Sequence, residues 1–68
     1  MTPDDVAAVL EANVGRRVRL TFDDGVIQCV DVGSVDDEGV LHSGPDGAEP
    51  KSYWTRFDGI TLVELLDD

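Results

Sequence analysis

Few side chains suited to catalysis occur in this 68-residue chain, and they form no recognisable catalytic arrangement. The chain has one histidine, His42, and one cysteine, Cys29, and no motif pairs either with a base or a nucleophile. Catalysis needs several groups held together, not one reactive residue. The serines, Ser34, Ser43 and Ser52, lack the glycine elbow that presents a nucleophilic hydroxyl. We therefore expect no catalytic site, and we interpret His42 as either exposed or hydrogen-bonded within the fold.

Two runs of acidic residues, Asp23–Asp24 and Asp36–Glu38, each precede a glycine and are typical of tight turns. A calcium loop needs oxygen ligands at alternate positions and a distant bidentate glutamate, and neither run has that spacing. The glycine-containing segment 44–47 lacks the Lys-Ser/Thr ending of a phosphate-binding loop. We expect no metal and no cofactor, and we interpret the acids as solvated hairpin ends.

The charge balance disfavours nucleic acid as a partner. Fifteen Asp and Glu stand against five Lys and Arg, a formal net charge of -10. Affinity for nucleic acid comes mostly from neutralised phosphates, and a surface this acidic repels them. A strong acid excess also fits a protein from a high-salt organism.

Arg16, Arg17 and Arg19 form the one basic cluster of the sequence, and Arg17 and Arg19 share a strand face. They could bind an acidic partner or a phosphate. They could also pair across strands with Asp31, or with the acidic helix described next. We favour pairing within the chain because acids outnumber bases throughout.

A helix is expected over residues 3–13. Thr2 suits the N-cap, Pro3 the first helical position, and Asp5 the acidic position of a capping box. Gly15 is a typical helix terminator. Three- and four-residue spacing gives one apolar stripe, formed by Val6, Val9, Leu10 and Val14.

Five strands are expected after the helix, because apolar and polar residues alternate between turn signals. Gly33 interrupts the second strand, and a glycine inside a strand often marks a bulge or bend. Cys29 lies in that same strand, and we interpret it as a small hydrophobic residue. A loop with two prolines and two glycines is expected over 44–50. The expected strands are 16–22, 26–35, 40–43, 51–56 and 60–66, with a single turn at 57–59.

From Leu10 to about Val63 the chain resembles the Sm-like proteins, which belong to the Src-homology-3-like small β-barrels. Four features carry the resemblance: a glycine after the helix and before an alternating strand, an acid-glycine turn, an aspartate ending the second strand, and a short turn before the last strand. In this chain they are Val14–Leu20, Asp24–Gly25, Asp36 and Phe57–Ile60.

The resemblance implies a short helix followed by a five-stranded, strongly bent small barrel. It also implies, as the alternative function, a nucleic-acid-binding surface that includes Asp36, Arg56 and Gly59. The chain departs from the family at several points. Cys29 stands where a glycine is usual, acids replace the asparagine that follows the aspartate, and Arg56 and Gly59 are separated by two residues.

Aromatic residues gather before the last strand, at Tyr53, Trp54 and Phe57. Neighbouring strand residues point to opposite faces, so Tyr53 and Trp54 cannot both face a core. We expect Phe57 in the core and one of Tyr53 and Trp54 at an interface or groove, because aromatic residues are enriched at interface centres.

We therefore expect one domain, 1–68, that acts as a non-enzymatic interaction or assembly module. A chain this short has a marginal core, and its last strand, 60–66, is low in charge, which favours self-association as a dimer or ring or binding of another protein. Candidate interaction residues are Tyr53, Trp54, Arg17 and Arg19. A lone cysteine, the absence of an export signal and the absence of a long apolar run lead us to expect a cytoplasmic protein that does not enter membranes.

Overall fold

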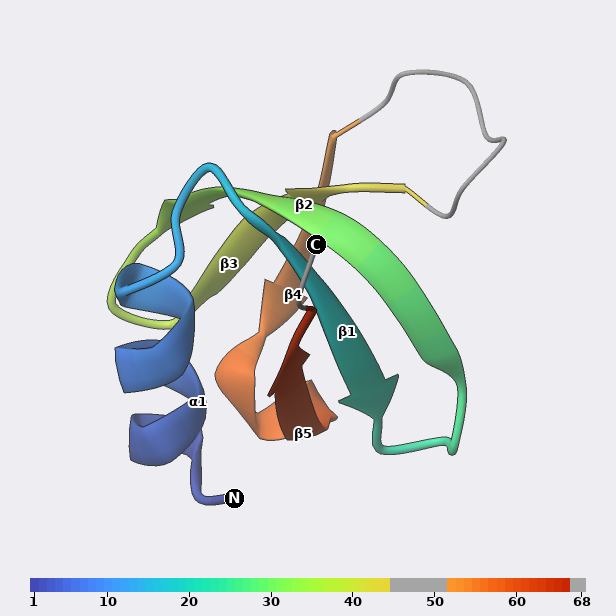
Figure 1. Ribbon diagram of the computed structural model, residues 1–68. Helices are drawn as coiled ribbons and strands as arrows, with labels where there is room; N and C mark the ends of the chain where they lie inside the picture. Colours follow the sequence, from blue (N-terminus) through green and yellow to red (C-terminus); the bar gives the residue numbers. More distant parts are fainter. Residues whose placement is uncertain (45–51, 67–68) are drawn as a thin grey trace.

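The computed structural model describes residues 1–44 and 52–66 (Figure 1). Within them lie one short helix and five strands, so the protein is mainly β, as the sequence predicts. A single 3₁₀ turn, η1 (Phe57–Gly59), joins the last two strands. The helix and strands are α1 (Pro3–Glu11), β1 (Arg17–Phe22), β2 (Ile27–Val35), β3 (Gly39–Ser43), β4 (Ser52–Arg56) and β5 (Ile60–Leu65).

The start of α1 confirms the predicted capping box. The Thr2 hydroxyl accepts the Asp5 N–H at 3.2 Å, and the Asp5 carboxylate accepts the Thr2 N–H at 3.3 Å. The end of the helix comes two residues earlier than expected. Asn13 leaves the helix, and its side-chain amide donates to the Val9 carbonyl at 2.7 Å. Val14 is therefore 49 % exposed, and its assignment to the apolar stripe was wrong.

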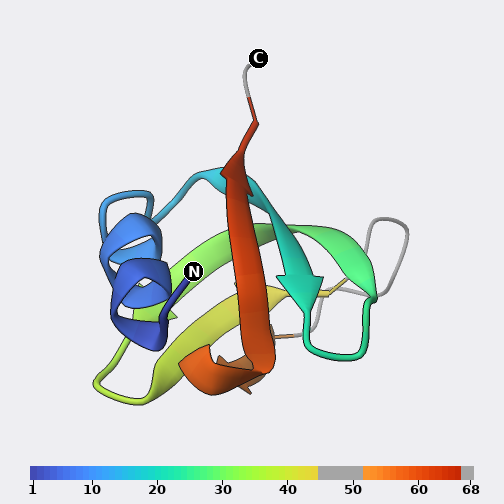
Figure 2. The ribbon, with the colours of Figure 1, turned by 90° about the horizontal axis from the view of Figure 1, so that it is seen from below.

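Every neighbouring pair of strands is antiparallel, in the order β4-β3-β2-β1-β5. The last strand thus returns to lie beside the first. β4 and β5 form the two edges and do not pair with each other, so the sheet is not closed. The sheet is nevertheless strongly bent, and Figures 1 and 2 show the long strand β2 arching along its length.

The predicted irregularity at Gly33 is confirmed. The register between β2 and β3 shifts between Val32 and Ser34. A Cβ at Gly33 would lie 2.9 Å from the Leu41 carbonyl oxygen, closer than real contacts allow. Glycine therefore lets β3 approach β2 at the bulge, where the extra residue increases the bend of the strand.

The observed strand bounds differ from the expected ones by one residue at most in the described part of the chain. The predicted loop over 45–50 and Lys51, the expected first residue of the fourth strand, lie outside the described residues. Among the described residues, no helix has the length and apolar character needed to cross a membrane.

The core lies between the sheet and α1, which packs against β2, β3, β5 and η1. Phe57 is only 6 % exposed, which confirms its predicted place in the core. β4 is the one described strand that contributes no buried side chain. The buried hydrophobic residues are Val6, Leu10, Val18, Leu20, Val30, Val32, Val40, Phe57, Ile60 and Val63.

Candidate functional site

The two aromatic candidates, Tyr53 and Trp54, lie on the edge strand β4 and are 44 % and 47 % exposed. The Tyr53 ring stacks on His42, with centroids 6.3 Å apart. The Trp54 indole lies on the opposite face of β4, where its Nε1 donates to Asp36 at 3.0 Å. The structure thus leaves both aromatic side chains partly open to solvent instead of burying one of them.

Close approach of Trp54 to β3 depends on a glycine that the sequence reasoning did not single out. A Cβ at Gly39 would meet the Thr55 carbonyl oxygen and would lie 2.7 Å from carbon atoms of the Trp54 ring. The missing side chain at position 39 therefore makes room for the indole. The sequence around Gly39 does not indicate this role, because the residues that Gly39 lies against belong to β4, where Gly39 pairs with Arg56.

His42 is buried, and both of its ring nitrogens have hydrogen-bond partners. Of the two alternatives expected for it, exposed or hydrogen-bonded within the fold, the second is the one observed. Its Nδ1 lies 2.7 Å from the Ser43 carbonyl oxygen, which can only accept, so Nδ1 carries the proton. Its Nε2 lies 2.8 Å from the Thr55 hydroxyl. The Nδ1 contact stays within β3, and the Nε2 contact to Thr55 joins β3 to β4.

Asp36 closes the turn between β2 and β3 with its own side chain. One oxygen accepts the N–H groups of Glu38 and Gly39, each at 2.8 Å, and the other accepts the Trp54 Nε1–H. These hydrogen bonds stabilise the charged form and hold the pKa of the Asp36 carboxyl below its usual value, the backbone N–H groups having the larger effect. Asp36 therefore directs both oxygens to its own chain.

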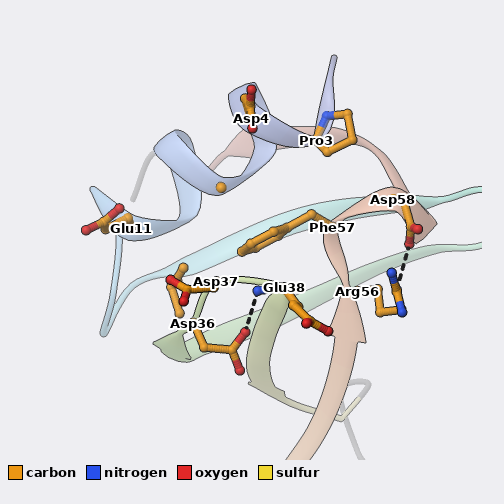
Figure 3. Close-up of a pocket in the computed structure, with 11 residues that line it drawn as sticks. Pro3, Asp4, Glu11, Asp36, Asp37, Glu38, Arg56, Phe57 and Asp58 are labelled. Atoms are coloured by element: carbon orange, nitrogen blue, oxygen red, sulfur yellow. Dashed lines mark hydrogen bonds and ion pairs between the residues drawn. The ribbon is translucent and has the colours of Figure 1, made fainter.

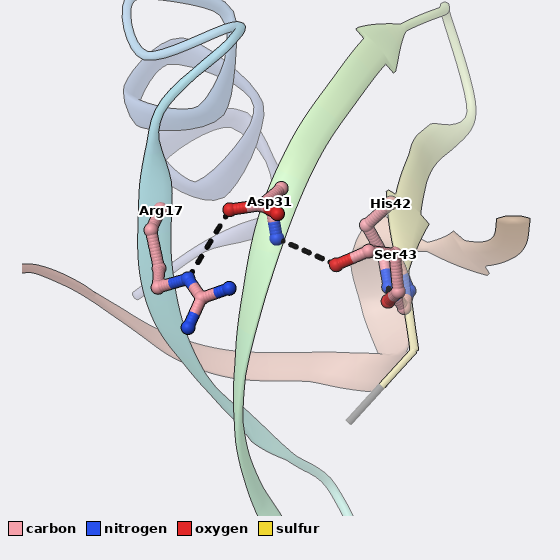
Figure 4. A network of polar contacts seen from close by, with 4 residues as sticks. All are labelled: Arg17, Asp31, His42 and Ser43. Carbon is pink, nitrogen blue, oxygen red and sulfur yellow. Dashed lines mark hydrogen bonds and ion pairs between the residues drawn. The ribbon is translucent and has the colours of Figure 1, made fainter. Parts of the chain in front are cut away.

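The two candidate arginines of β1 are both paired with acids, as favoured from the sequence. Arg17 Nε lies 3.2 Å from Asp31 Oδ1 on β2 (Figure 4), which is one of the partners expected. Arg19 makes two hydrogen bonds to Glu64 on β5, at 2.7 and 3.2 Å. Glu64 was not foreseen as a partner, because local spacing does not reveal that β5 lies beside β1.

The Arg19–Glu64 pair is the better aligned of the two, because two donors meet the two oxygens of one carboxylate. The hydrogen bond and the attraction between charges raise the pKa of Arg19 and lower the pKa of Glu64. Cys29 lies opposite Arg19 on the outer face of the sheet. Cys29 is free and only partly buried.

A hollow of about 500 Å³ lies between α1, the β2–β3 turn and η1 (Figure 3). It brings together Asp36 and Arg56 but not Gly59, the third residue of the alternative nucleic-acid surface. Arg56 pairs with Asp58 at 3.4 Å. Acids dominate the rest of the lining, which includes Asp4, Glu11, Asp37 and Glu38. Such a hollow repels phosphate.

Among residues 1–44 and 52–66, no group of three His, Cys, Asp or Glu side chains could hold a metal ion.

Met1 occupies part of the free edge of β5. Its amino nitrogen donates to the Thr61 carbonyl at 3.2 Å, and the Val63 N–H donates to the Met1 sulfur at 3.3 Å. The sequence reasoning did not identify this contact, because nothing in the spacing of the first residues indicates that they reach the last strand.

Compared with known proteins, the chain matches no family model, no curated protein and no solved structure. The candidate site is therefore defined by the geometry of the chain itself. It consists of two edge strands with exposed apolar side chains, together with Arg17, Arg19 and Arg56, each paired with an acid.

Proposed function

We propose that this protein is a non-catalytic assembly module with an Sm-like, Src-homology-3-like small-barrel fold, and that it self-associates through the edge strands of its sheet. The support for the fold is a short helix followed by a strongly bent meander whose last strand returns beside the first. The 3₁₀ turn η1 stands where the resemblance expects the short turn before the last strand. The free cysteine suits a reducing compartment such as the cytoplasm.

The observation that carries the proposed self-association is the position of the exposed apolar side chains. Tyr53 and Trp54 on β4, and Leu62 and Leu65 on β5, are each at least 40 % exposed. These strands are the two edges of the sheet, where unpaired backbone groups can bind another strand. Apolar surface and unpaired backbone therefore coincide, which favours strand addition over a purely solvated edge.

The small core supports the same proposal. A domain of this length buries only about 60 % of its unfolded surface, so association adds burial that the monomer lacks. The alternative function, nucleic-acid binding, draws no comparable support. Arg17, Arg19 and Arg56 each pair with a carboxylate, and the hollow that contains Asp36 and Arg56 is acidic.

Sedimentation velocity over a concentration range tests the proposed function. We expect a mass above that of one chain, 7.3 kDa, at micromolar concentration. A mass that stays at 7.3 kDa at every concentration would contradict self-association.

A further inference from the structure

We propose that β4, and not β5, is the assembling edge, and that two copies of the chain pair β4 with β4 in antiparallel orientation about a two-fold axis at Trp54. The inference rests on the proposed self-association and specifies its surface and its symmetry. The resulting dimer has one sheet that continues through both copies.

The edge of β5 is already in use. Met1 accepts the Val63 N–H and donates to the Thr61 carbonyl, and both groups point away from β1. A second chain that added a strand here would have to displace Met1 from the middle of β5. A strand with occupied backbone groups is a poorer template than one whose groups are free.

The edge of β4 is open. Directly after β4, the Phe57 N–H donates to the Glu38 carbonyl, toward β3. In an antiparallel pair the backbone groups of alternate residues point to the same neighbouring strand. The backbone groups of Thr55 and Tyr53 therefore also point toward β3. The groups of Ser52, Trp54 and Arg56 therefore point away from the sheet. In the described part of the chain, no hydrogen bond beyond the strand ladders uses them.

The charges on β4 itself permit a contact between two copies. The chain carries a net charge of -10, so any contact between two copies must overcome repulsion between acids. β4 contains no carboxylate, and Arg56 is its single charged residue. An antiparallel pair centred on Trp54 places Arg56 of one copy opposite Ser52 of the other, which avoids like charges directly across the strands.

Burial leads to the same strand. β4 places no side chain in the core, and Tyr53 and Trp54 remain about half exposed. Pairing about Trp54 brings the two indoles to the centre of the contact, where buried aromatic residues contribute most to binding. A symmetric contact of this kind closes at two copies and does not continue into a ring or filament.

Replacement of Arg56 by proline tests this edge with little disturbance of the fold. The Arg56 backbone has φ -69° and ψ 148°, which proline adopts without strain. Its N–H points away from the sheet, so Arg56→Pro removes a donor only from the open edge. Arg56→Ala is the matched control, because it loses the same ion pair with Asp58 but keeps the N–H.

We expect the wild type and Arg56→Ala to sediment as dimers of twice 7.3 kDa, and Arg56→Pro to sediment as a folded monomer at the same concentration. A chain that begins at Thr2 should remain a dimer, because Met1 does not take part. A folded Arg56→Pro protein that still assembles, or assembly that grows when Met1 is removed, would overturn the use of β4. A wild type that is monomeric throughout would instead overturn the proposed self-association.

Amide hydrogen exchange of the wild type gives an independent readout if Arg56→Pro does not fold. The N–H groups of Trp54 and Arg56 should exchange more slowly as concentration rises through the monomer–dimer transition, while that of Leu65 should not change. Free exchange of the Trp54 and Arg56 amides at concentrations where the protein is a dimer would contradict the proposal.

Discussion

The Trp54 indole donates a hydrogen bond to Asp36 at 3.0 Å, and this contact joins the edge strand β4 to the turn between β2 and β3. The same aspartate also accepts two backbone N–H groups of its own turn. One carboxylate thus fixes both a hairpin and the side chain at the centre of the proposed interface.

We expect Asp36 to make stability depend on pH. Its folded-state pKa is lowered by the N–H groups of Glu38 and Gly39 and by Trp54, so the unfolded chain holds its proton more tightly. The stabilisation is complete above the ordinary aspartate pKa and is lost as pH falls through the lower folded-state pKa. Chemical unfolding at neutral and acidic pH should show that Asp36→Asn costs stability near pH 7 and less in acid. An equal loss at both pH values would contradict this role.

Phe57→Ala should lower the free energy of unfolding by about 3–5 kcal/mol, the usual loss for a large buried aromatic, and is expected to unfold most of the protein. Trp54→Ala and Tyr53→Ala remove half-exposed rings and should cost much less stability, while Trp54→Ala weakens association. Thermal melts together with sedimentation measure both effects. If Phe57→Ala melts like the wild type and either β4 variant unfolds, the assignment of core and surface is reversed.

Gly39→Ala should destabilise the protein by roughly 1–3 kcal/mol, the range for overpacking, because the added methyl group meets Thr55 and the Trp54 ring. Gly59→Ala is the matched control, since its Cβ would lie 3.8 Å from its nearest neighbour, a Thr55 methyl group. Urea unfolding and Trp54 fluorescence should show a loss and a spectral change for Gly39→Ala alone. Similar behaviour of both variants would refute the close packing of the indole on β3.

We expect no appreciable binding of RNA or DNA at physiological salt. The net charge is -10, and three of the four described arginines, Arg17, Arg19 and Arg56, already pair with acids. Fluorescence anisotropy with a uridine-rich oligonucleotide and a mixed duplex is the appropriate measurement. Micromolar or tighter binding that weakens steeply with added salt would show a working phosphate-binding patch and would restore the alternative function.

The features that could be read from the sequence are those with local causes. The capping box of Thr2 and Asp5 and the bulge at Gly33 follow from residue types at fixed short spacings. The pairing of Arg17 with Asp31 follows from the register of one hairpin. The burial of Phe57 followed from the need of a small core for large apolar side chains.

The features that could not be read arise from long-range pairing. Arg19 meets Glu64 only because β5 returns to β1, and Met1 reaches Val63 for the same reason. The role of Asp36 in binding Trp54 depends on the approach of β4 to the β2–β3 turn. Alternation along one strand indicates which side chains share a face, but not which strand lies next to it.

The most direct test of the central claim, self-association through β4, is the molar mass of the wild type and of Arg56→Pro measured side by side by sedimentation. A wild type above 7.3 kDa that becomes a folded 7.3 kDa monomer on introduction of the proline is the predicted result. A wild type that never exceeds one chain, or a folded Arg56→Pro protein that assembles as well as the wild type, would contradict it.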